Sequence, residues 1–239
     1  PASPGTAGSF DRRRRDGGSP GPAEAGHRHH RPDARPDLAQ VFGAAAPHAD
    51  VQLAGALDGL ADAEVSALAV PGPYPLLVRL ADGTTAEIPR DSLVPRVTAA
   101  ARALADQGAA LVVVACAGEF PAIACGVPVL VPGKVVPATV RAVAAGARIG
   151  IVTPNLAQVP YAAAKWQSDG FHVVVAHASP ARHDEMTAAA AVLRAAEVTL
   201  VVLDCMGHDD AYRAEFARLS ERPTIAVQTL VAELAGAMV

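Results

Sequence analysis

Short apolar runs alternate with helix-like segments through the second half of the chain, and this rhythm limits the fold more than any other feature. The first run, ALVVVAC, ends at Cys116, and others follow as VPVLVP, ARIGIVTP, FHVVVAH, VTLVVLDC and TIAVQ. Strands that are apolar on both faces are typical of parallel sheets covered by helices. The composition agrees, because 51% of the 239 residues are hydrophobic and only 4% are aromatic. The sequence therefore predicts an α/β protein.

The first half of the ordered pattern is more varied. Helices are expected over 36–46, 62–69 and 91–107, and a short strand over 51–54. The stretch LLVRLADGTTAEIPR alternates around Asp82-Gly83, which predicts a β-hairpin. In a largely parallel sheet, ligands bind at the carboxyl ends of the strands, so the loops after Ala115, Val152 and Leu203 are the ones to inspect.

Charge and cysteine content exclude several classes of protein. The net charge is −4 and the isoelectric point about 6.1, so neither nucleic acid nor an anionic membrane is an expected partner. No apolar run approaches the roughly 20 residues of a membrane span, and no signal-peptide segment is evident. An odd count of three cysteines does not suit a disulfide framework. We expect a cytoplasmic protein.

Two cysteines stand where a hydrophobic strand meets a glycine-containing turn. Cys116 begins CAGEF and Cys205 begins CMGHDD, whereas Cys125 lies among small apolar residues and is expected only to pack. A thiol at such a strand end lies near the N-terminus of the next helix, which favours the thiolate. Two thiols facing each other across a cleft can act as base and acid on one carbon. Either cysteine alone is better explained by packing, and only the pair in equivalent strand-end turns makes a functional role as plausible as packing.

Motifs for cofactors and metals are missing from the sequence. It has neither a GxxxxGK[ST] phosphate loop nor a GxGxxG after a strand, so no cofactor is expected. The histidines after residue 34 are not spaced as pairs of zinc ligands are, so no metal is expected either. His208, three residues beyond Cys205, would lower the pKa of that thiol if its ring pointed inward.

Several motifs, in order, resemble the AroM family. They are LADGTTAEIPR, ACAGEFP, IVTPNLAQVPYAAAKWQ, VVLDCMGHDDAYR and RPTIAVQTLVAELAGAMV. The resemblance covers Arg35 to Val239 without large gaps. The AroM family is in turn similar to the cofactor-independent aspartate/glutamate racemases. That implies two pseudo-symmetric lobes of mostly parallel sheets flanked by helices, over 35–145 and 146–228, with a closing helix at 229–239 that packs back on the first lobe.

The same resemblance implies an active site between the lobes, with one cysteine from each. By position these are Cys116 and Cys205, which would exchange the α-proton of a small carboxylic or amino acid. In racemases the first cysteine is usually followed by Asn-Thr and the second by Thr-His. In this chain Ala-Gly follows Cys116 and Met-Gly follows Cys205. The residues expected to bind the substrate are Arg35, Asp37, Gly118, Glu119, Thr153, Gly207 and His208.

Three functions are consistent with these features. The first is a racemase-like isomerase that uses the two thiols as acid and base. The second is a non-catalytic protein that binds a metabolite in the same cleft, which the departures from the racemase motifs favour. The third is a structural partner in an oligomer. A small carboxylate is the expected ligand, and a homodimer is compatible with the sequence.

Residues 1–34 differ from the rest, being rich in Gly, Pro, Ser, Arg and His with little to bury. Such a composition predicts a disordered tail. AroM proteins begin with a hydrophobic strand and a TIGQxPRxD motif, where this chain has GHRHHRPDAR. Codons for that stretch, read one base later, can spell GIVTIGQTP before Arg35. We therefore hypothesise an out-of-frame N-terminus that lacks the first strand; a natural tail and a metal site at His27, His29 and His30 are the alternatives. The DNA sequence decides between them.

Overall fold

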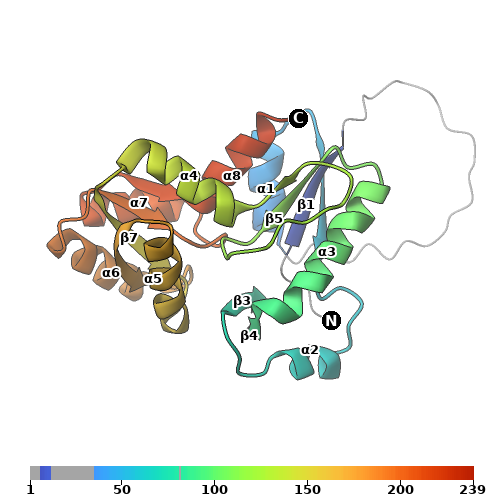
Figure 1. The fold of residues 1–239 in the computed structure, drawn as a ribbon, viewed down its shortest axis with the longest axis horizontal. Coiled ribbons are helices and arrows are strands. Elements are labelled where there is room, and N and C mark those ends of the chain that lie inside the picture. Colours follow the sequence, from blue (N-terminus) through green and yellow to red (C-terminus); the bar gives the residue numbers. More distant parts are fainter. Residues whose placement is uncertain (1–5, 12–34, 81) are drawn as a thin grey trace, which may run out of the picture.

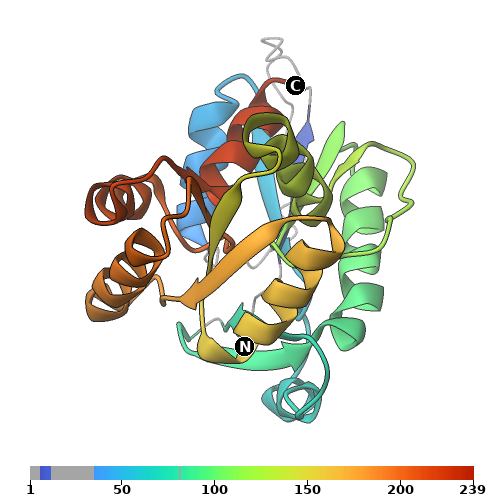
Figure 2. The same cartoon turned by 60° about the vertical axis from the view of Figure 1, so that its left-hand side comes forward.

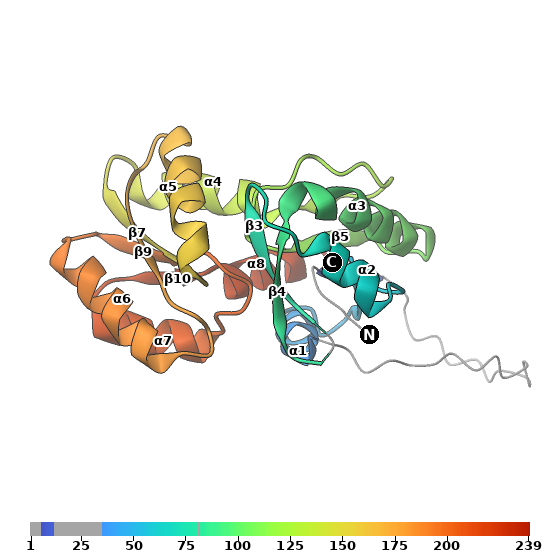
Figure 3. The ribbon, with the colours of Figure 1, turned by 90° about the horizontal axis from the view of Figure 1, so that it is seen from below.

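Two sheets with helices on their faces form two lobes that lie side by side (Figure 1, Figure 3). The computed structural model describes residues 6–11, 35–80 and 82–239. The elements of the first lobe are β1 (Thr6–Asp11), α1 (Pro36–Ala45), β2 (Asp50–Gly55), α2 (Asp62–Leu68), β3 (Pro75–Arg79), β4 (Thr85–Pro89), α3 (Arg90–Asp106), β5 (Leu111–Ala115) and β6 (Val129–Leu130). Helix α4 (Pro132–Ala144) then leads into the second lobe. No described helix is long and apolar enough to cross a membrane.

The second lobe has the parallel sheet that the sequence predicts. Its strands run in the order β10-β9-β7-β8, and every pair is parallel. Helices α6 and α7 cover one face and α5 covers the other (Figure 2). The elements are β7 (Arg148–Thr153), a short 3-10 helix (Leu156–Gln158), α5 (Val159–Ser168), β8 (His172–His177), α6 (His183–Ala195), β9 (Leu200–Leu203), α7 (Asp210–Ser220), β10 (Thr224–Ala226) and α8 (Val227–Gly236).

The first lobe departs from the expected parallel arrangement. Its sheet has the order β2-β1-β5-β6, and β1 pairs antiparallel with both neighbours, placing Thr6 opposite Gly55 and Ala115. Only β5 and β6 are parallel. The expectation that residues 1–34 form no strand is therefore wrong for Thr6–Asp11, which lies between β2 and β5. Residues 12–34, including the three N-terminal histidines, lie outside the described part of the chain.

Alternate residues of the central strands supply different hydrophobic cores. In β5, Leu111 and Val113 join a core shared by both lobes, whereas Val112 and Val114 pack on the side of α3. In β9, Val202 belongs to the shared core and Val201 to the core beneath α6 and α7. Strand side chains alternate between faces, so unbroken apolar runs are needed where both faces are buried.

Helix α8 follows the last strand of the second lobe but packs on α1 of the first (Figure 1). The two helix backbones come close at Gly236. A Cβ atom built there would collide with the main-chain oxygen of Ala45 and lie 2.7 Å from its carbonyl carbon. Because backbone atoms cannot move aside as a flexible side chain does, this close packing requires glycine.

The substitution Gly236→Ala is expected to lower the free energy of unfolding by about 1–3 kcal/mol, because α1 and α8 must separate. The matched control is Gly43→Ala within α1, where nothing lies within 4 Å of the added Cβ. That change should raise stability by up to about 1 kcal/mol through helix propensity. Urea denaturation measures both, and equal midpoints for the two variants would show that the helix contact is not this tight.

Candidate functional site

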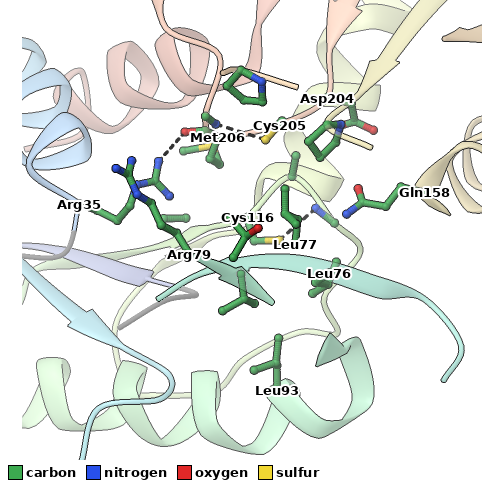
Figure 4. Close-up of a pocket in the computed structure, with 18 of the residues that line it drawn as sticks. Arg35, Leu76, Leu77, Arg79, Leu93, Cys116, Gln158, Asp204, Cys205 and Met206 are labelled. Atoms are coloured by element: carbon green, nitrogen blue, oxygen red, sulfur yellow. Dashed lines mark hydrogen bonds between the residues drawn. The ribbon is translucent and has the colours of Figure 1, made fainter. Parts of the chain in front are cut away.

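A cavity of about 320 Å³ lies between the lobes (Figure 4). The first lobe contributes residues of the β3–β4 hairpin and the turn after β5. The second lobe contributes Pro154, Gln158, 179–181 and the turn after β9. The hairpin also contacts the second lobe directly, because Asn155 Nδ2 donates a 2.8 Å hydrogen bond to Glu87 Oε1. The cavity is therefore formed by both halves of the molecule.

Cys116 and Cys205 line this cavity from two turns of the same design. In each turn the backbone N–H two residues further on points at the sulfur. Gly118 N lies 3.4 Å from Cys116 Sγ, and Gly207 N lies 3.3 Å from Cys205 Sγ. Figure 4 shows both sulfur atoms at the cavity, one from each lobe. The likeness between the two turns follows from the shared Cys-x-Gly sequence at the end of a central strand.

The glycine of each turn has little room for a side chain. A Cβ at Gly118 would lie 2.9 Å from Leu76 Cδ2 of the hairpin, and one at Gly207 would lie 3.0 Å from Pro180 Cγ. A side chain at either glycine, where racemases carry the second polar residue after each cysteine, would therefore require Leu76 or Pro180 to move. Backbone N–H groups, rather than side chains, approach the sulfur atoms here.

Burial controls the ionisation of both thiols. It raises the pKa of Cys205 to about 11, an effect that the N–H of Gly207 and the charge of Arg35 only partly offset. Burial also raises the pKa of Cys116, while the N–H of Gly118 and the charge of Lys165 act in the opposite direction. The expectation that the position at a strand end favours thiolates is thus wrong, because burial outweighs it and keeps both thiols protonated at neutral pH.

A buried ion pair connects the two cysteine turns, and sequence reasoning missed it. Lys165 Nζ donates to the carbonyl of Ala117 at 3.2 Å and lies 3.5 Å from Asp204 Oδ2. Trp166 Nε1 donates to the same carboxylate oxygen at 3.0 Å. The lysine side chain is 2% exposed and the aspartate 8%. The sequence offered one sign of this pair: an acidic residue, Asp204, directly before Cys205 at the end of an apolar strand.

Arg35 and Asp37 lie together at the other end of the cavity. Arg35 Nη2 donates to Asp37 Oδ2 at 2.7 Å and to the Met206 carbonyl at 2.9 Å, so the first lobe also contacts the second cysteine turn. Burial alone would raise the pKa of the Asp37 carboxyl, but the hydrogen bonds and charge of Arg35 outweigh it and lower that pKa. The charge of Arg35 is therefore largely matched by Asp37.

The remaining expected site residues lie outside the cavity lining. Glu119 is exposed, in a separate surface groove beside Arg90. Thr153 is buried and donates from its hydroxyl to the Asn155 carbonyl at 2.9 Å. His208 is fully buried, with Nε2 3.0 Å from the Ala178 carbonyl. The residues that the cavity brings together are Cys116, Cys205, Arg35, Asp37, Gly118 and Gly207.

His208 does not act on Cys205 in the way that the sequence suggested. Desolvation by burial lowers the pKa of its imidazole to about 4. Its ring packs against Tyr212 in a tilted arrangement, with 4.5 Å between centroids. The ring is neutral at pH 7, so it adds no positive charge that would favour a thiolate. Elsewhere in the described chain, no group of three or more His, Cys, Asp or Glu side chains is arranged to hold a metal ion.

Comparison with known proteins identifies one family. The family described as "AroM protein" matches residues 30–239. No functionally curated protein matches the sequence significantly. A solved structure of unliganded arylmalonate decarboxylase is 18% identical with a TM-score of 0.45, over 62% of this chain and 75% of that one. A second structure of arylmalonate decarboxylase is 16% identical with a TM-score of 0.48, over 64% and 79%. At these identities the likeness concerns the fold alone.

Proposed function

This chain belongs to the AroM family, and on the geometry of its cleft we propose that it is a cofactor-independent, racemase-like isomerase of a small carboxylic or amino acid. One observation carries the proposal: Cys116 and Cys205, in turns of the same design from different lobes, line one cavity. A substrate held between them would have one sulfur on each side of its α-carbon.

The proposed reaction moves two protons. A thiolate on one side removes the α-proton and becomes a thiol, and the carbon retains the electron pair as a carbanion. The thiol on the other side then donates its proton to the opposite face of the carbon and becomes a thiolate. Cys116 is the better candidate for the initial thiolate, because the charges of both Lys165 and Arg35 act to lower its pKa, whereas only Arg35 does so for Cys205.

The alternative function is a protein that binds a metabolite without transforming it. The observation that favours it is the ionisation of the site, because burial raises the pKa of both thiols. Among the described residues, no histidine or carboxylate is hydrogen-bonded to either sulfur. A binding protein needs no thiolate, whereas the isomerase must form one when the substrate binds.

Exchange of the α-proton with solvent distinguishes these functions. The full-length chain is incubated in D2O with a panel of small carboxylic and amino acids, and loss of the α-proton signal is followed by NMR. We expect exchange with at least one acid, and a rate about 100-fold or more lower in Cys116→Ser and in Cys205→Ser. The control is Cys125→Ser, which removes the thiol that lies outside the cavity lining.

Exchange that persists unchanged in both cavity variants would exclude the two-thiol mechanism. Binding of an acid without any exchange would favour the metabolite-binding alternative. The rate should also rise as the pH increases above neutrality, because the fraction of thiolate rises toward the elevated pKa values of the two thiols.

A further inference from the structure

A second, smaller cavity of about 30 Å³ adjoins the cavity that the two thiols line. Four residues line both cavities, namely Leu76, Gly118, Gln158 and Asp204. The rings of Tyr74 and Tyr161, which come from different lobes and lie 5.2 Å apart between centroids, form part of its wall. A polar space of this size holds a group as large as one water molecule. It has room for a single substituent of a ligand that lies between the thiols.

Asp204 brings an unused acceptor to the place where the two cavities meet. Its side chain is 8% exposed, and the Lys165 ammonium lies 3.5 Å from its Oδ2 atom. The Trp166 N–H donates to the same oxygen at 3.0 Å. The Oδ1 atom is buried and has no hydrogen-bond partner among the described residues. Because a buried acceptor without a donor costs free energy, such atoms are rare and indicate a partner from outside the chain.

Gln158 adds a free amide group at the same place. Its backbone N–H is held by Asn155 Oδ1 at 3.0 Å, but its side-chain amide forms no hydrogen bond with any described residue. Figure 4 shows this side chain extending toward the thiols. An amide offers an acceptor oxygen and two N–H donors. A ligand group that donates to Asp204 can therefore also form a hydrogen bond with Gln158.

We propose that Asp204 and Gln158 bind a hydrogen-bond-donating substituent, a hydroxyl or an ammonium group, on the α-carbon of the acid. The proposal rests on the cleft of the proposed function and narrows its substrate class to α-hydroxy and α-amino acids. The smaller cavity lies beside both cysteine turns. Asp204 directly precedes Cys205, and Gly118 belongs to the turn of Cys116. An α-carbon held between the sulfur atoms would thus carry its substituent close to this cavity.

The same contact bears on the ionisation of the thiols. Besides burial, the negative charge of Asp204 raises the pKa of Cys116 and of Cys205. A donor bound at Oδ1 offsets part of that charge, and an ammonium group offsets more of it than a hydroxyl does. Binding of the substituent therefore favours the thiolate that the isomerase must form.

Binding measurements on matched ligands test the site. Isothermal titration calorimetry on the full-length chain compares isovalerate, 2-hydroxyisovalerate and valine, and likewise 3-phenylpropionate, 3-phenyllactate and phenylalanine. Within each set only the α-substituent differs. In at least one set we expect the hydroxy acid or the amino acid to bind about 10-fold or more tightly than the unsubstituted acid, because it satisfies the buried acceptor. The member that gains more identifies the group as hydroxyl or ammonium, and smaller gains in both sets, or no binding by any member, would overturn the proposal.

Variants then test the two side chains. Gln158→Leu should reduce the preference for the donor-bearing acid about 10-fold and leave the affinity for the unsubstituted acid unchanged. Asp204→Asn should abolish the preference, because the Trp166 N–H keeps the amide oxygen on its side and an NH2 group replaces the free acceptor. If loss of the charge partner of Lys165 prevents this variant from folding, Gln158→Leu still decides, since that change leaves the ion pair intact.

The control is Gln40→Leu, at an exposed position of α1 outside both cavity linings, which should keep the wild-type preference. An equal loss of affinity for all members of a set in Gln158→Leu would indicate a merely structural role and overturn the site. An unchanged preference in that variant would overturn it as well.

The binding assay involves no proton transfer, so the two proposals fail separately. A preference that Gln158→Leu removes, without any α-proton exchange, would contradict the isomerase and retain this site. Exchange by a protein whose affinities do not depend on the α-substituent would retain the isomerase and contradict the site.

Discussion

Replacing Lys165 with methionine is expected to lower the free energy of unfolding by about 3–5 kcal/mol. The substitution leaves the Asp204 carboxylate buried without its cation, next to Cys205, with only the Trp166 N–H as a donor. It also removes the hydrogen bond that holds the Ala117 carbonyl in the first cysteine turn. The cost is large because both charged side chains are almost completely removed from water.

Urea denaturation measures this loss, and the chain supplies a close control. Lys134, its other lysine, is exposed on α4, so Lys134→Met should change stability by less than about 0.5 kcal/mol. The double variant Lys165→Met with Asp204→Asn should recover part of the loss. Asparagine removes the unpaired charge and keeps an oxygen for the Trp166 N–H. If Lys165→Met unfolded at the same urea concentration as Lys134→Met, the buried pair would have no structural role.

Stability is also expected to fall by about 3 kcal/mol between pH 6.5 and pH 4 through His208 alone. Desolvation lowers its pKa from the ordinary 6.5 to about 4 in the folded protein. Between these values the unfolded chain binds a proton that the folded chain does not, so acid favours unfolding. The stabilisation is complete above pH 6.5 and is lost as the pH falls toward 4. The buried Nδ1, which has no hydrogen-bond partner in the described structure, explains why the ring stays neutral.

The His208→Gln variant isolates this contribution. Glutamine retains a donor for the Ala178 carbonyl but does not titrate, so its stability should fall less steeply over this pH range. Other groups titrate in both proteins, and the difference between the two curves therefore reports His208. His172→Gln, at an exposed position of β8, is the control for the histidine-to-glutamine replacement itself. Parallel curves for His208→Gln and the wild type would place the ring in a more polar environment than the structure indicates.

The expected elements after residue 35 correspond closely to the observed ones because their side-chain periodicity is strong. Helix boundaries differ slightly: α3 spans Arg90–Asp106, one residue earlier at each end than expected. Strand β1 could not be predicted, since TAGSFD has one large apolar residue and no alternating pattern. Its pairing with β2 and β5 uses backbone groups, which every residue carries. An out-of-frame origin for this segment stays a hypothesis for the DNA sequence to decide.

The sequence by itself determined the alternation of strands and helices and the pair of Cys-x-Gly turns at strand ends. These features are local, because they depend on the period of apolar residues and on a few adjacent positions. Only the tertiary structure decided that both cysteine turns line one cavity, that Lys165 reaches Asp204, and that His208 is neutral. Those properties depend on which surfaces meet when the lobes pack. Burial and partner charges set the ionisation of a side chain, and both come from residues distant in the chain.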